Sequence, residues 1–136
     1  MLNFTYNIPT KVIFGKDELE RLPKEILLHG KRVLFLYGKD SIKKTGLYDK
    51  VVSLLNNKGI FFTELSGVKP NPSISSVREG IKIIRENNLD YILAVGGGSV
   101  IDCAKAVSAG VGYAGDPWDF LIAKANVRKV LPVRSI

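Results

Sequence analysis

The segment Val95-Gly96-Gly97-Gly98-Ser99 is where this 136-residue chain most densely gathers residues suited to binding chemistry. Its three glycines separate the apolar run 90–95 from a segment with helical spacing that opens at Ser99. Glycine lets a ligand reach main-chain amides, and amides at a helix start attract a diphosphate because the helix dipole lies behind them. The alternative is a tight turn that merely needs glycine. A strand before the turn and a helix after it favour phosphate binding by Gly97, Gly98 and Ser99, although the spacing is not the G-x-G-x-x-G fingerprint.

Asp102 and Lys105 follow this turn at intervals of three residues. Asp102 falls on the first turn of the expected helix, where an acid can stabilise the dipole. It could equally direct a polar group to the nicotinamide or ribose end of a cofactor. For Lys105, a surface role and a role in the site are both open.

A second candidate site is formed by Gly38, Lys39, Asp40 and Ser41, which follow the apolar run 32–37. In dinucleotide-binding folds, residues at this position meet the adenosine ribose. There an acid binds a free 2′-hydroxyl, and a basic residue favours a 2′-phosphate. Because Lys39 stands next to Asp40, spacing alone leaves the choice of nucleotide open.

The elements that must position these residues alternate between strand and helix. Short apolar runs predict strands, two of them buried on both faces, at 32–37, 60–65 and 90–95. Helical spacing predicts helices at 17–28, with Pro23 as a kink or second start, at 47–58, at 73–88 with Ser73 as N-cap, and from 99 onward. We also expect an extended segment at 3–14, a loop or short turn at 38–46, one helical turn at 120–124 and the beginning of a strand at 130–133. This pattern predicts an α/β fold: a Rossmann-like parallel sheet with helices on both faces.

Composition bounds the class of protein. Apolar residues make up 46% and charged residues 24%, as in a soluble single domain. The net charge of +7 comes from scattered basic residues, so we interpret it as a solvated surface and expect no nucleic-acid partner. No apolar run approaches the ~20 residues that cross a bilayer, and no signal-peptide layout precedes residue 14, so we expect a cytoplasmic protein without a membrane partner. The single cysteine, Cys103, cannot form an internal disulfide.

Several short motifs occur together in one order. They are Gly38 to Gly46 with Tyr48-Asp49, Asn71-Pro72-Ser73, Gly96-Gly97-Gly98-Ser99 with Asp102 and Lys105, Gly115-Asp116-Pro117-Trp118-Asp119, and Leu131-Pro132-Val133. Over residues 3–133, the chain resembles the iron-containing (group III) alcohol dehydrogenases, especially the NADPH-using, butanol-dehydrogenase-like branch. The resemblance implies a dehydroquinate synthase-like amino-terminal nucleotide domain, followed in the family by a helical domain.

The resemblance also assigns roles to the candidate residues. Gly97, Gly98 and Ser99 would cradle the diphosphate, Asn71 would line the cofactor cleft, and Asp102 would approach the nicotinamide. The loop of Gly38, Lys39, Asp40 and Ser41 would hold the adenosine ribose. Because Lys39 stands where NAD-preferring relatives often carry aspartate, the expected cofactor is NADP, with NAD as the alternative.

The family's catalytic iron or zinc is held by one aspartate and three histidines of the helical domain, and this chain has one histidine, His29, at an expected helix end. We therefore expect residues 1–136 to form one nucleotide-binding domain that ends short of the metal centre and is inactive alone. The intact relative would exchange hydride between NAD(P) and a primary alcohol or aldehyde, and a homo-oligomer is compatible with the resemblance. A non-catalytic nucleotide-binding remnant and a glycerol dehydrogenase-like polyol oxidoreductase remain as alternatives.

Overall fold

A four-stranded parallel sheet forms the centre of the molecule. The computed structural model describes residues 3, 5, 7–39, 41–70 and 73–136. The strands are β1 (Arg32–Tyr37), β2 (Phe61–Leu65), β3 (Tyr91–Val95) and β4 (Val133–Ser135), and their order across the sheet is β2-β1-β3-β4. The central strand β3 is buried along its whole length, and β1 is buried apart from its first residue. The parallel sheet expected from the apolar runs is therefore confirmed.

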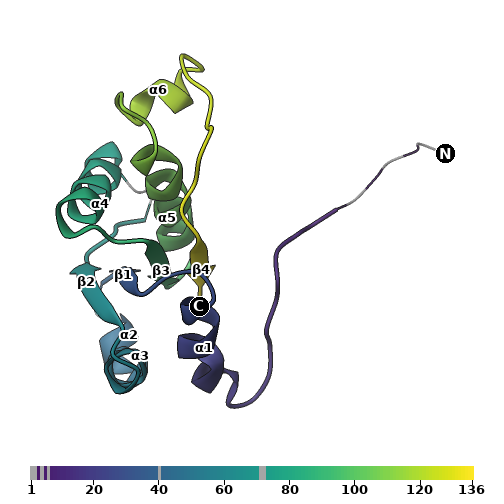
Figure 1. The fold of residues 1–136 in the computed structure, drawn as a ribbon, viewed down its shortest axis with the longest axis vertical. Helices are drawn as coiled ribbons and strands as arrows, with labels where there is room; N and C mark the ends of the chain where they lie inside the picture. Colours follow the sequence, from purple (N-terminus) through teal and green to yellow (C-terminus); the bar gives the residue numbers. More distant parts are fainter. Residues whose placement is uncertain (1–2, 4, 6, 40, 71–72) are drawn as a thin grey trace.

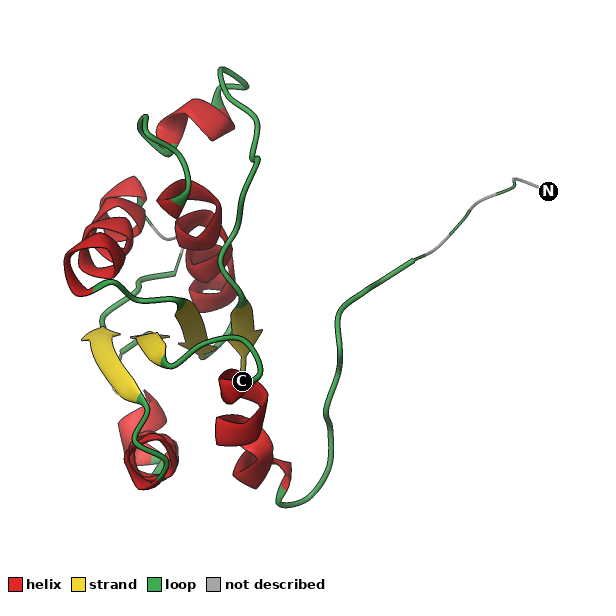
Figure 2. Ribbon diagram, viewed as in Figure 1, coloured by secondary structure: helices red, strands yellow, loops and turns green. Residues whose placement is uncertain are grey.

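Helices cover both faces of the sheet, as the alternating pattern predicted (Figures 1 and 2). On one face, α4 (Ile74–Asn87) and α5 (Gly98–Val111) share a core with Leu34 and Leu36 of β1. On the other face, α1 (Leu22–Leu27) and α3 (Leu47–Asn57) share a core with Val33 and Phe35. Successive side chains of a strand point to opposite faces, which is why β1 supplies both cores. The short elements are the 3₁₀ helix Glu18–Arg21, α2 (Ser41–Lys44) and α6 (Trp118–Leu121).

Several element bounds differ from the sequence prediction. The expected helix 17–28 is divided into the 3₁₀ turn and α1, and Pro23 stands in the first turn of α1, where its missing N–H costs nothing. The expected loop 38–46 contains α2, because Ile42 is drawn into the core. Ser73 precedes α4 as predicted, yet its hydroxyl pairs with that of Ser75 at 2.6 Å and caps no backbone amide.

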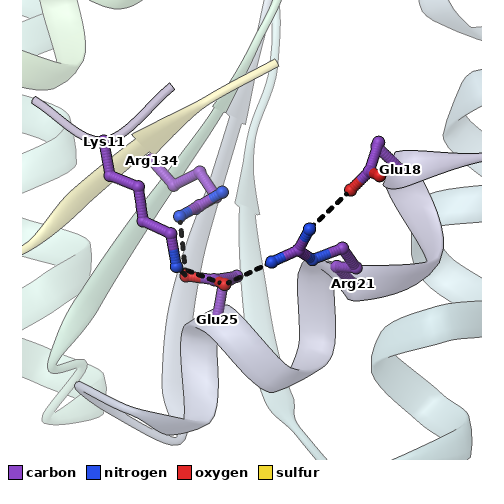
Figure 3. Close-up of polar contacts among 5 residues, drawn as sticks. All are labelled: Lys11, Glu18, Arg21, Glu25 and Arg134. Atoms are coloured by element: carbon purple, nitrogen blue, oxygen red, sulfur yellow. Dashed lines mark hydrogen bonds and ion pairs between the residues drawn. The ribbon is translucent and has the colours of Figure 1, made fainter. Parts of the chain in front are cut away.

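The amino-terminal segment extends away from the body, and its described residues lie outside the sheet (Figure 1). Glu25 of α1, which is 4% exposed, joins this segment to β4. Its carboxylate accepts hydrogen bonds from Lys11 Nζ at 2.7 Å and from Arg134 at 3.1 Å. It also forms a longer ion pair with Arg21 at 3.9 Å (Figure 3). The Lys11 ammonium, aided by the two guanidinium groups and opposed by burial, holds the pKa of Glu25 below its usual value.

In the part of the chain that the structure describes, none of the helices has the length and apolar character needed to cross a bilayer.

Candidate functional site

Two of the predicted site segments meet at the carboxyl edge of the sheet. Tyr37, the last residue of β1, pairs in register with Val95, the last residue of β3. Gly38 and Gly96 follow these two residues and therefore lie side by side. The side chain of Val100 packs over both, since a Cβ built on Gly38 would lie 3.6 Å from Val100 Cγ2 and one on Gly96 would lie 2.8 Å from it. Chain segments almost 60 residues apart thus form one continuous surface.

The three glycines of the turn have different physical reasons to be glycine. Gly96 has φ +149°, which disfavours any other residue, and an added Cβ would press against Val100. Gly97 has an ordinary extended backbone, with φ −79° and ψ −172°. A Cβ added to Gly97 or Gly98 would meet no atom of the described residues within 4 Å. The turn itself therefore explains Gly96 only, and the other two glycines keep a space open above the start of α5.

That space is lined by backbone donors. The amides of Val100 and Ile101 donate to the carbonyl of Gly97 at 3.0 and 3.2 Å. The amides of Gly98 and Ser99 come earlier in the helix and have no acceptor within it. No side chain caps this end, and the helix runs for 14 residues behind it. An open surface of unused amides at the positive end of a helix dipole is suited to an anionic group such as a diphosphate.

Asp102 and Lys105 lie on the exposed side of α5, one to two turns from the open amides. Their side chains are both 70% exposed, and Lys105 Nζ lies 3.9 Å from Asp102 Oδ1. An exposed pair at this distance contributes little to stability, so both side chains are free to turn toward a ligand. They border a groove of about 460 Å³ between α5, α6 and the start of α4, which Cys103, Ala106 and Trp118 also line.

The second predicted segment is tied to the connection that follows β2. The carbonyl of Gly38 accepts from Gly67 N–H at 2.9 Å, and that of Tyr37 accepts from Val68 N–H at 3.3 Å. Lys39 and Ser41 are exposed, and Ser41 begins α2. Asp40 and Asn71, two of the predicted site residues, lie outside the described residues. The structure thus brings Gly38, Gly97, Gly98 and Ser99 to one edge.

A polar cluster beneath this edge was not predicted from the sequence. The carboxylate of Glu64, on β2, accepts the hydroxyl of Tyr37 at 2.5 Å and that of Tyr48 at 2.6 Å. Burial, reinforced by Glu64, raises the pKa of Tyr37, and the hydrogen bond to Glu64 followed by burial raises the pKa of Tyr48 to about 12. The sequence does carry one signal. Glu64 follows Phe62 by two residues, so a charged side chain shares a strand face with an aromatic one.

The described residues do not form a metal centre. No three or more of their histidine, cysteine, aspartate or glutamate side chains gather closely enough to hold a metal ion. His29 is exposed just past the end of α1, where its amide donates to the carbonyl of Ile26 at 2.9 Å. No step of chemistry is therefore assigned to a metal held by these residues.

The sequence of the chain matches one family of known proteins over most of its length. The family model described as iron-containing alcohol dehydrogenase matches residues 9–136. NADH-dependent butanol dehydrogenase A of Clostridium acetobutylicum is 52% identical over the whole chain, which covers 35% of that protein. NADPH-dependent aldehyde reductase YqhD of Escherichia coli is 41% identical, again with the whole chain covering 35% of its length.

A solved structure also superposes closely. The crystal structure of NADH-dependent butanol dehydrogenase A from Thermotoga maritima matches with a TM-score of 0.93 and 46% identity, over 98% of this chain and 34% of that one. The chain thus spans about a third of the length of the relatives that it matches.

Proposed function

Because this chain belongs to the iron-containing alcohol dehydrogenase family, we propose that it binds a nicotinamide nucleotide across the carboxyl edge of its sheet. The diphosphate lies on the amides of Gly98 and Ser99, and the adenosine ribose lies against Gly38, Lys39 and Ser41. Asp102 is directed toward the nicotinamide end. Asp40 and Asn71 complete the set of residues that we propose for the site.

The observation that carries this proposal is the open space at Gly97 and Gly98. Neither residue needs to be glycine for its backbone conformation or for packing against the described part of the chain, because an added Cβ meets none of its atoms within 4 Å at either position. A ligand that approaches the amides closely supplies the missing reason.

In the proposed reaction of the whole enzyme, this domain holds the nucleotide while hydride passes between the nicotinamide ring of the nucleotide and an alcohol or aldehyde carbon. Relatives named for butanol dehydrogenase and aldehyde reductase activity support that substrate class. The described residues hold no metal centre, so we propose that the 136-residue domain binds nucleotide without turnover.

The charge at Lys39 bears on which nucleotide is bound. An exposed ammonium favours the 2′-phosphate of NADP, whereas an aspartate at the same edge favours the free 2′-hydroxyl of NAD. Relatives of both kinds match the chain, with 52% identity to an NADH-dependent enzyme and 41% to an NADPH-dependent one. We retain NADP as the proposed cofactor on the ground of Lys39, and tighter binding of NADH in a parallel titration would overturn that choice.

Thermal unfolding of the chain with added nucleotide tests the proposal. A ligand at ten times its Kd stabilises the folded state by about 1.4 kcal/mol, so the Tm should rise with the concentration of NADPH. Polyglutamate at equal ionic strength is the control, because a +7 chain attracts polyanions without a specific site and polyglutamate carries no phosphate. A Tm unchanged at millimolar NADPH, or raised equally by polyglutamate, would refute nucleotide binding.

A further inference from the structure

The cluster of Glu64, Tyr37 and Tyr48 lies directly under the segment that we assign to the adenosine ribose. Tyr37 is the last residue before Gly38, and only 3% of its surface is exposed. Tyr48 is on α3, beyond the far end of that segment, and its ring meets the ring of Tyr37 edge-on, with centroids 5.7 Å apart. Both hydroxyls donate to the same half-buried carboxylate, so Glu64 joins β1, β2 and α3 at one point.

Lys43 extends the cluster to α2. Its Nζ lies 5.2 Å from the ring centroid of Tyr48 and 5.9 Å from that of Tyr37. A phenol that donates its proton toward a carboxylate becomes richer in electrons, which strengthens the attraction of its ring for a cation. The negative charge of Glu64 thereby strengthens the attraction between the two tyrosine rings and the ammonium group of Lys43.

The helix that Lys43 occupies needs such an anchor. α2 has four residues, far fewer than an isolated helix needs to be stable in water. Ile42 holds it to the core from one side, at 5% exposure, and Lys43 holds it to the tyrosine rings. Gly38, Lys39 and Ser41 therefore lie between two attachment points. Tyr37, before them, is held by the pairing of β1 and by its bond to Glu64, and Lys43, after them, is held by the two tyrosine rings that Glu64 orients.

We propose that Glu64 is a positioning residue for nucleotide binding, which acts through Tyr37, Tyr48 and Lys43 to fix the adenosine-ribose segment that starts at Gly38. This inference rests on the proposed function for the identity of the ligand. The anchoring itself is a property of the chain without ligand. A carboxylate at this place orders the site, but it loses hydration when it is partly buried. An apolar side chain among Phe35 and Phe62 would avoid that cost.

Hydrogen exchange in the ligand-free chain tests the anchoring. Tyr48→Phe removes one hydroxyl–carboxylate bond of about 1.5–3 kcal/mol, so amides in residues 38–46 should exchange about 10- to 100-fold faster. Glu64→Gln should have a larger effect, because one amide oxygen must serve two hydroxyls and the charge is lost. Tyr113→Phe is the matched control. It removes a 2.9 Å hydroxyl–carboxylate bond to Asp119, which follows the end of α5 that is opposite the glycine turn.

Nucleotide titration of the same variants tests the effect on binding. Tyr48→Phe and Lys43→Met should raise the Kd for NADPH about threefold to tenfold, since an ordered segment loses its anchor. Lys43→Arg should restore the affinity, because guanidinium also binds over an aromatic face. The Kd for inorganic pyrophosphate, which has no ribose, should stay the same in every variant.

The outcomes separate the two proposals. If exchange in residues 38–46 is equal in Tyr48→Phe, Tyr113→Phe and the unsubstituted chain, Glu64 does not position the segment. Faster exchange without any binding of NADPH by the unsubstituted chain would uphold the anchoring and refute the proposed function. Faster exchange with an unchanged Kd for NADPH would overturn the link between Glu64 and the nucleotide.

Discussion

Replacing Gly98 with alanine distinguishes a ligand-binding glycine from a turn-forming one, because the two roles predict opposite changes in stability. Gly98 is the first residue of α5, and an added Cβ would meet no atom of the residues that the structure describes within 4 Å. Alanine restricts the unfolded chain more than glycine and favours helix. The Gly98→Ala domain should therefore be more stable by about 0.4–1 kcal/mol, which corresponds to a rise in Tm of roughly 1–5 °C.

The same substitution should weaken the binding of NADPH. The new methyl group occupies the space through which a diphosphate reaches the amides of Gly98 and Ser99. Loss of one charge-assisted hydrogen bond costs about 1.5–3 kcal/mol, so the Kd should rise about 10- to 100-fold. Thermal unfolding followed by circular dichroism and calorimetric titration with NADPH measure the two effects on one preparation.

Gly96→Ala is the control for the opposite case. Its φ of +149° and the 2.8 Å approach of Val100 Cγ2 to an added Cβ should destabilise the domain by about 1–3 kcal/mol. A Gly98→Ala domain that is destabilised in the same way, or that binds NADPH as tightly as the unsubstituted chain, would refute the assignment of the open space to a ligand.

Four further measurements follow from the structure. Lys39→Asp should lower the affinity for NADPH relative to NADH about tenfold, as judged by parallel titrations, because it removes a 2′-phosphate partner and adds a repelling charge. The pKa of Glu25 is lowered in the folded chain, chiefly by the hydrogen bond from Lys11, so its stabilising effect is present above the unfolded-state pKa and is lost as pH falls through the folded one. The difference in Tm between the unsubstituted chain and Glu25→Gln should thus shrink on acidification from pH 7 to pH 3. Burial raises the pKa of the Cys103 thiol to about 11, so a thiol reagent at pH 8 should label it only after denaturation. The isolated chain should not oxidise NADPH in the presence of butanal, and turnover without added metal would contradict the proposed division of roles.

The sequence predicted the central strands well because a strand buried on both faces must be apolar throughout. The prediction was less accurate at the carboxyl end, where β4 begins at Val133 and not at Val130. The residues before it belong to a different contact, since the hydroxyl of Ser108 on α5 donates to the carbonyl of Leu131 at 2.6 Å. A bond between residues 23 apart cannot be read from the hydrophobic pattern of a short run.

The candidate site divides in the same way. The glycine turn and the ribose segment are each a short run of consecutive residues, and each follows a strand. Topology alone therefore places both at one edge. The partnership of Glu64 with Tyr37 depends on the pairing of β1 with β2, in which Phe35 lies opposite Glu64. That pairing is a property of the sheet, and a lone glutamate in an apolar strand indicates only that some partner exists.

The glycines of this chain show why the site could not be assigned from the sequence alone. Gly80 of α4 is a packing glycine, because an added Cβ would lie 2.7 Å from Val107 of α5, where the two helices meet. Gly96 is a glycine of conformation, and Gly97 and Gly98 are neither of these. The sequence does not distinguish these glycines. Only the atoms around each one show whether it is needed for helix packing, is needed for its backbone conformation, or leaves open space. The glycines that the fold itself does not need are the ones to assign to a ligand. Gly97 and Gly98 stand at the start of α5, and Gly38, where an added Cβ would make only ordinary contacts at 3.6 Å, lies at the same edge of the sheet.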